Sequence, residues 1–213
     1  MRISDDRYSR DRLRLDIALR FIRHEARTRT IRVWTGLTDD RIRKLYRFYI
    51  SDSDNAVPPR HRGKSPQQIG FFMRSARARQ QSALFASLCC MLGALPAAAP
   101  GSLEAARALP SLARAELLCQ AYELYRALFP VPLISFEHGV FLLGALTRSD
   151  ELTLAACRDC GAVVVADRWS LRAPRCTLCA IDPAMLAIGA ALPAPAAGDA
   201  PHSVSSAADT VAA

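Results

Sequence analysis

Several features are scarce in this chain of 213 residues, and each scarcity excludes a class of protein. No apolar run approaches about 18 residues, so we expect no transmembrane helix and no membrane partner. The best candidate, residues 88–99, is too short and is interrupted by Pro96. The first seven residues contain no apolar segment, so we expect no secretory signal either.

Catalytic patterns are also missing. The four histidines are His24, His61, His138 and His202. None of them has a partner at a metal-binding or nucleophile-activating spacing, and the sequence contains no P-loop, glycine-rich dinucleotide fingerprint or Ser-His-Asp order. Glu137 and His138 are neighbours at an expected helix start, where such a pair is more often a cap or a surface pair than a catalytic dyad. We therefore expect neither an enzyme nor a small-molecule substrate.

Acidic residues are outnumbered in the first 80 residues, which hold 20 Lys or Arg against 9 Asp or Glu. Residues 81–213 hold 8 basic and 11 acidic residues, so the whole net charge of +8 comes from the first part. This asymmetry predicts nucleic acid as a partner of the N-terminal part of the chain. The alternative is a solvated helix face in a protein from a GC-rich genome, because arginine outnumbers lysine there by 18 to 2.

Four of the seven cysteines form two CxxC pairs near the C-terminal end. The first pair is Cys157 and Cys160, and the second, after fifteen intervening residues, is Cys176 and Cys179. This spacing predicts one tetrahedral zinc site. Four thiolates at about 2.3 Å fill the coordination shell and leave no position for water, so we expect the zinc to be structural.

The alternatives to a structural zinc site are a redox pair, a catalytic zinc and four unrelated core cysteines. A redox pair would need a CxxC at a helix N-terminus in a βαβ setting, and neither pair has that context. A metalloenzyme would need an open coordination position, and unrelated core cysteines would not fall into two pairs. We expect the other three, Cys89, Cys90 and Cys119, to be buried in apolar helices. Seven cysteines without an expected signal favour reduced thiols and a cytoplasmic location.

The remaining pattern predicts a mainly α protein. Apolar residues recur at helical spacing over residues 11–33, and Thr38 is the expected N-cap of a second helix over 38–50. Residues 51–64 read as a loop. Ser65 with Gln68 fits a capping box before a long helix that ends near residue 95. Proline breaks separate further helices, which we expect at residues 102–108, 111–129 and 135–148.

We expect three regions along the chain. Residues 1–150 form a helical, basic domain that binds DNA and a protein partner. Residues 151–182 form a small four-cysteine zinc-ribbon-like module, with a strand over 162–165 and a return strand over 169–171. Residues 183–213 are rich in Ala, Pro and Ser, and we expect this tail to be disordered.

The stretch from Ile31 to Arg47 matches a helix-turn-helix. A turn at Gly36 separates two helical segments, and the apolar residues fall where this motif buries its side chains. The second segment would expose basic residues on its outer face. The alternative is an ordinary helical hairpin with a basic face.

The candidate DNA contacts are the basic residues between positions 41 and 79, which would neutralise phosphates. They are Arg41, Arg43, Lys44, Arg47, Arg60, Arg62, Lys64, Arg74, Arg77 and Arg79.

Taken together, these patterns resemble the family of the flagellar transcriptional activator subunit FlhC. The resemblance covers about residues 11–180. It rests on three segments, Leu37-Thr-Asp-Asp-Arg-Ile-Arg-Lys-Leu-Tyr46, Ser65-Pro-Gln-Gln-Ile-Gly-Phe-Phe-Met73 and Ala121-Tyr-Glu-Leu-Tyr125, and on the four-cysteine module that follows a long helical part. The Ala/Pro-rich tail and the basic loop 51–64 depart from the family pattern.

The resemblance implies a function that composition and spacing do not give. FlhC-type proteins join the smaller helical protein FlhD in a heterohexamer. That complex binds promoter DNA upstream of operons for bacterial flagellum biogenesis and recruits RNA polymerase as a transcription activator. The family's zinc ligands correspond to Cys157, Cys160, Cys176 and Cys179. The alternative is a zinc-stabilised protein–protein adaptor without sequence-specific DNA binding, whose basic half only keeps it in solution.

Overall fold

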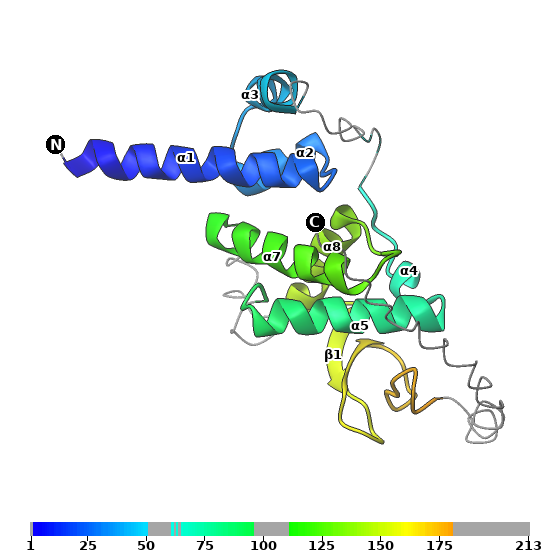
Figure 1. Ribbon diagram of the computed structural model, residues 1–213. Coiled ribbons are helices and arrows are strands. Elements are labelled where there is room, and N and C mark those ends of the chain that lie inside the picture. The colour runs from blue at the N-terminus through cyan, green and yellow to red at the C-terminus, as the bar shows by residue number, and fades with distance from the viewer. Residues whose placement is uncertain (1, 51–60, 62, 64, 96–110, 181–213) are drawn as a thin grey trace, which may run out of the picture. The chain divides into compact units, whose positions relative to one another are not determined.

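The computed structural model describes residues 2–50, 61, 63, 65–95 and 111–180. The prediction of a mainly helical protein with a C-terminal cluster of four cysteines is confirmed (Figure 1). The elements are α1 (Arg2–Arg23), α2 (Thr28–Thr35), α3 (Asp39–Leu45), the π-helical turn η1 (Tyr46–Ile50), α4 (Gly70–Met73), α5 (Ala76–Met91), α7 (Leu112–Leu128), α8 (Phe136–Arg148), β1 (Leu152–Ala156) and β2 (Val163–Asp167).

The long first helix, α1, packs against α2 and α7. Its buried residues Ile17, Phe21 and Ile22 follow the predicted helical spacing. The prediction of one helix over residues 11–33 is wrong, because the chain turns after Arg23. Glu25 adopts the left-handed conformation with φ 61°, and the N–H of Ala26 donates to the Phe21 carbonyl at 2.9 Å. This pattern ends a helix without the glycine that would have revealed it.

The helix expected from residue 65 to residue 95 is also interrupted. Residues 65–69 precede the short α4, and Ser75 then caps α5 by accepting a hydrogen bond from the N–H of Ala78 at 3.1 Å. The capping box predicted at Ser65 does not start a helix there. Packing explains the interruption: Phe72 is fully buried beside α8 residues, with its ring centroid 5.9 Å from that of Phe141.

Helices α7 and α8 begin where the sequence predicts. Ser111 and Ser135 are their N-caps, and each side chain accepts a backbone N–H three residues on. Hydrogen bonds to a buried tyrosine hold the loop between α7 and α8 in place. The hydroxyl of Tyr125 donates to Gln81 and accepts from the N–H of Leu133 and of Ile134, each at 3.0 Å.

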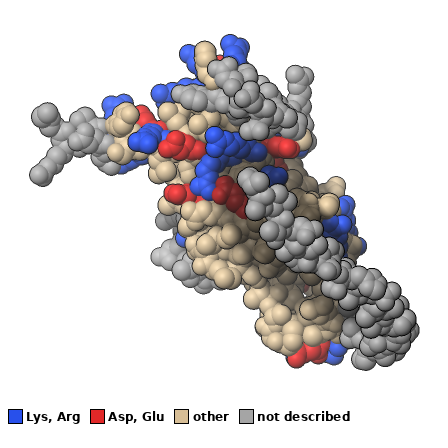
Figure 2. Space-filling model, in the orientation of Figure 1, with Lys and Arg blue, Asp and Glu red and all other residues tan. Residues whose placement is uncertain are grey.

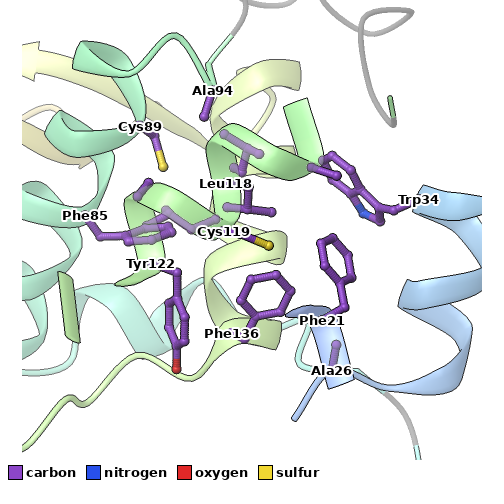
Figure 3. Close-up of a cluster of buried hydrophobic side chains, with 14 of the residues drawn as sticks. Phe21, Ala26, Trp34, Phe85, Cys89, Ala94, Leu118, Cys119, Tyr122 and Phe136 are labelled. Atoms are coloured by element: carbon purple, nitrogen blue, oxygen red, sulfur yellow. The ribbon is translucent and has the colours of Figure 1, made fainter. Parts of the chain in front are cut away.

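The core lies between α1, α2, α5, α7 and α8, and aromatic side chains fill its centre (Figure 3). The rings of Phe21 and Phe136 meet edge to face with centroids 4.8 Å apart, and Tyr122 meets Phe136 in the same manner at 5.2 Å. Phe85 approaches from α5 on the far side of Tyr122. Each such pair adds about 0.5–1.5 kcal/mol to the stabilisation from burial alone.

The two strands form an antiparallel hairpin in which Leu152 pairs with Asp167 and Ala156 with Val163. The predicted strand at residues 162–165 therefore exists, but the return strand expected at residues 169–171 is wrong. Its partner lies upstream, because the first CxxC pair forms the turn of the hairpin. The hairpin packs on α5 and α8, and Leu152 is part of the same core as the helices.

Several predictions concern residues that the structure does not describe. These are most of the loop 51–64, the helix at 102–108 and the tail 183–213. Within the described ranges, no helix is both long enough and apolar enough to cross a membrane.

Candidate metal centre and basic surface

The four predicted ligands come together. The sulfur atoms of Cys157, Cys160, Cys176 and Cys179 all lie within 4.8 Å of one another, and those of Cys160 and Cys176 are 3.7 Å apart. Tetrahedral coordination with metal–sulfur bonds of about 2.3 Å places its sulfur atoms about 3.8 Å apart. The observed separation fits that geometry, so the cluster can hold one metal ion.

The first pair of cysteines lies in a tight turn at the end of β1. The N–H of Gly161 donates to the Cys157 carbonyl at 2.8 Å, and the N–H of Cys157 donates to the Ala162 carbonyl at 2.8 Å. Gly161 has φ 74°, a conformation that a residue with a side chain adopts only under strain. This glycine allows the chain to reverse and to direct both thiols to one side.

The second pair of cysteines is fixed against the first by backbone and side-chain bonds. The N–H of Arg158 donates to the Pro174 carbonyl at 3.0 Å. Asp159 accepts from Nε of Arg175 at 2.6 Å and from Nε of Arg158 at 3.3 Å. The hydrogen bond from Arg175 is the main cause of the lowered pKa of Asp159. A carboxylate from the first turn thus joins both turns.

Backbone donors lower the pKa of two of the four thiols, Cys157 and Cys176, whereas hydrogen bonds with the Cys176 and Cys160 thiols raise the pKa of Cys179 to about 12. The N–H of Cys176 donates to the sulfur of Cys157 at 3.3 Å, and the N–H of Cys179 donates to the sulfur of Cys176 at 3.3 Å. The first of these bonds, followed by the N–H groups of Asp159 and Cys160, lowers the pKa of Cys157 to about 6. A thiol that ionises readily is suited to bind a metal cation.

The three remaining cysteines differ in burial. Cys89 and Cys119 are buried in the core, as predicted, and burial raises the pKa of Cys119 to about 12. Cys90 is exposed, so the prediction that it is buried is wrong. It follows Cys89 on α5 and therefore points to a different side of that helix.

The predicted helix-turn-helix residues adopt the expected arrangement. Gly36 ends α2 in the left-handed conformation with φ 70°, and Thr38 caps α3 by accepting from the N–H of Arg41 at 3.4 Å. The apolar side chains that the motif should bury are all at most 6% exposed, and they are Ile31, Leu37, Ile42 and Leu45. Two short helices joined by a three-residue turn therefore share one buried side.

The basic residues of this pair point away from the core. Arg41, Arg43, Lys44 and Arg47 are all exposed. Nη1 of Arg43 binds Oδ1 of Asp40 at 2.7 Å, whereas the other three have no ion-pair partner among the described residues. Blue side chains stand over α3 at the top of Figure 2. The acidic start of α3 is thus partly neutralised by its own helix.

A second group of predicted basic residues lies around α4 and α5. Arg74, Arg77 and Arg79 are exposed. The guanidinium of Arg74 lies 4.5 Å from the centre of the Phe71 ring, and Nη2 of Arg77 donates to the Val131 carbonyl at 2.7 Å. Two of the three are thus held in place by the protein. Arg60, Arg62 and Lys64 lie outside the described residues.

Sequence reasoning missed a polar cluster between α1 and α7. Nε and Nη2 of Arg20 donate to the two carboxylate oxygens of Glu123 at 3.2 and 2.8 Å, and Nε2 of His24 lies 2.9 Å from the same carboxylate. Figure 2 shows basic and acidic side chains side by side over these two helices. The partners are about a hundred residues apart in sequence, so no local spacing could have revealed the cluster.

A second missed residue is Glu137, which sequence reasoning placed in a surface or capping pair. Its carboxylate is buried and accepts from the N–H of Arg27 at 2.8 Å and from the hydroxyl of Thr30 at 3.1 Å. A negative charge near the N-terminus of α2 is favourable. Glu137 therefore joins α8 to the start of α2, and its surroundings explain its burial without catalysis.

Comparison with protein-family models gave no match for this chain, and a search of curated proteins gave none either.

Proposed function

We propose that this protein is a DNA-binding transcription activator, the FlhC-type subunit of a complex with an FlhD-like protein. In this proposal the complex binds promoters of flagellar operons and recruits RNA polymerase. The protein has no catalytic activity and takes no small-molecule substrate. The proposal combines the resemblance in sequence with the α2–α3 helix pair and the four-cysteine cluster.

The observation that carries the proposal is the α2–α3 pair. Its apolar side chains are buried, and its basic side chains stand on the outside of two helices joined by a short turn. A helix presented in this manner can lie in the major groove, with basic side chains reaching phosphates and base edges. Arg74, Arg77 and Arg79 are further candidates for contacts with the DNA backbone.

The four-cysteine cluster supports a structural role for zinc in the same proposal. A closed shell of four thiolates suits Zn²⁺ and leaves no position for a reacting water. Three arginines of this module are already engaged. Arg158 and Arg175 bind Asp159, and Arg168 donates to the Ser149 carbonyl at 2.5 Å. The module therefore contributes mainly by shaping the protein, and the helical part supplies most contacts with phosphates.

One observation favours the adaptor function as a second candidate. Trp169, Leu171 and Leu178 of the metal-binding module are 73%, 103% and 70% exposed. Exposed apolar side chains in one small module often mark a surface that binds another protein. An adaptor would use this surface and would bind no DNA sequence selectively.

The two candidates differ in one experiment. The protein is co-expressed with the FlhD-like subunit, and the product is analysed by size exclusion and by mobility shift of a flagellar promoter fragment. The activator proposal expects a larger complex that retards this fragment at salt concentrations where a shuffled fragment stays free. A complex that retards neither fragment at moderate salt would favour the adaptor.

A further inference from the structure

A groove with an apolar floor lies between α1 and α3. Leu15 and Leu19 of α1 and Leu45 of α3 line it, and its volume is about 410 Å³. Tyr8 lines the same groove, and its side chain is 71% exposed. Leu15 and Leu19 are only half-buried, although leucine side chains gain stability from complete burial. The groove therefore offers apolar surface that this chain leaves partly open to solvent.

The rim of the groove on the α3 side is basic. Arg41 and Lys44 both line it, and neither has an ion-pair partner among the described residues. The opposite rim carries Asp11 and Asp16, each of which is ion-paired with an arginine of α1 itself. The unbalanced charge at the groove is thus positive and belongs to α3.

This combination fits a protein helix better than it fits DNA. An amphipathic helix places apolar side chains on one face and charged side chains beside them, which matches a leucine floor next to a basic rim. A DNA duplex offers phosphates to the rim but no row of apolar groups to the leucines. The charge of the rim calls for acidic residues on the docking helix.

We propose that the α1–α3 groove is the docking site for an amphipathic helix of the FlhD-like subunit, with acidic side chains of that helix facing Arg41 and Lys44. This inference rests on the proposed function, which supplies the partner. It divides the basic residues of α3 and η1 into two sets. Arg41 and Lys44 face the partner, whereas Arg43 and Arg47 do not line the groove. Arg47 remains available to DNA, and Arg43 can reach DNA if its exposed ion pair with Asp40 opens.

Paired charge reversals test this division. R41E/K44E and R43E/R47E make the same change of charge on the same stretch of helix, and all four side chains are exposed. R43E also breaks the ion pair with Asp40, but that pair is exposed and contributes little to stability, so both variants should fold. Affinity for the FlhD-like subunit, measured by titration calorimetry without DNA, should fall at least about 10-fold in R41E/K44E because like charges then face each other. It should stay within about threefold of the wild-type value in R43E/R47E.

A photo-cross-linking amino acid at position 8 gives an independent readout, because Tyr8 lies in the groove and is exposed. In the assembled complex with promoter DNA, we expect an adduct with the FlhD-like subunit. An adduct with DNA or with a second copy of this chain would overturn the docking site.

The outcomes separate the two proposals. If the wild-type complex forms and R41E/K44E binds the partner as tightly as the wild type, the docking site is overturned and the proposed function stands. If the wild-type chain does not bind the FlhD-like subunit at all, both are overturned.

Discussion

At the scale of single residues, Cys176 has the most connected position in the metal centre. Its sulfur lies 3.7 Å from that of Cys160 and accepts the N–H of Cys179, while its own N–H donates to the sulfur of Cys157. These contacts join the two CxxC turns through one residue. Because a site of this kind does not form in an unfolded chain, a metal ion bound to these four sulfur atoms would also stabilise the folded module.

The Cys176→Ser variant tests the four-thiolate site. Loss of a group that only orients a ligand lowers metal affinity about 10–100-fold. A hydroxyl is a poor zinc ligand, so loss of the thiolate itself should lower zinc affinity by more than that. Zinc per chain, measured by mass spectrometry after dialysis against a weak chelator, should drop from about one to well below one. The exposed Cys90 on α5 provides the control, and Cys90→Ser should keep its zinc. Undiminished zinc in Cys176→Ser would refute the assignment.

His24 links stability to pH. Its side chain is 9% exposed, and burial, opposed by Glu123, lowers its pKa below the usual 6.5. As pH falls below 6.5, the unfolded chain takes up a proton that folded His24 resists, so stability falls with pH until the folded pKa is reached. Glu123 acts at lower pH: burial opposes its ionisation, but bonds from Arg20 and His24 lower its pKa on balance.

The His24→Gln variant should lose part of this pH dependence. Between about pH 7.5 and 5.5, its urea midpoint should change less than that of the wild type, because the amide does not titrate. Effects of the thiolates are common to both proteins and cancel in the difference. An equal pH dependence in His24→Gln would show that His24 contributes nothing.

At the scale of elements, α8 contains two glycines with opposite surroundings. A methyl group on Gly139 would lie 2.9 Å from Cζ of Phe85, whose ring is fixed in the core. A methyl group on Gly144 would meet only the flexible end of Arg148, at 3.3 Å. The first glycine allows α5 and α8 to approach closely, whereas the second weakens the helix without such a benefit.

The two alanine variants should therefore change stability in opposite directions. Gly139→Ala should destabilise by about 1–3 kcal/mol through overpacking. Gly144→Ala should stabilise by about 0.5–1 kcal/mol because alanine favours the helix. Urea denaturation of both variants measures the difference. Stabilisation by Gly139→Ala would mean that α5 and α8 do not pack as described.

The same elements show which parts of the fold could be predicted from the sequence. Prolines located α7 and α8 correctly, because such breakers act within one turn, and the structure adds serine N-caps at both starts. The break after Arg23 could not be predicted, since Glu25 replaces the expected glycine and the turn follows from packing of α2 on α1. The partner of β2 was misplaced because two flanking segments have similar patterns and only tertiary contacts decide between them. The four-cysteine cluster was predictable because its members are close in sequence.

At the scale of the whole molecule, the hydrophobic core and the positive charge are distributed differently along the chain. The hydrophobic core draws on residues from Ile17 to Val165 and includes the hairpin that carries the cysteines. The excess of positive charge lies in the first 80 residues. The hairpin with the four-cysteine cluster thus shares a core with the basic helical part, and we infer that this basic part meets DNA and the partner subunit together.

The affinity of the complex with the FlhD-like subunit for flagellar promoter DNA, measured by fluorescence anisotropy across a salt series beside a shuffled sequence, tests the central claim most directly. We predict that the promoter binds at least about 1,000-fold more tightly than the shuffled sequence, and that both affinities fall steeply with salt as counterions are released. Equal affinities for the two sequences, or affinities that do not depend on salt, would contradict the account.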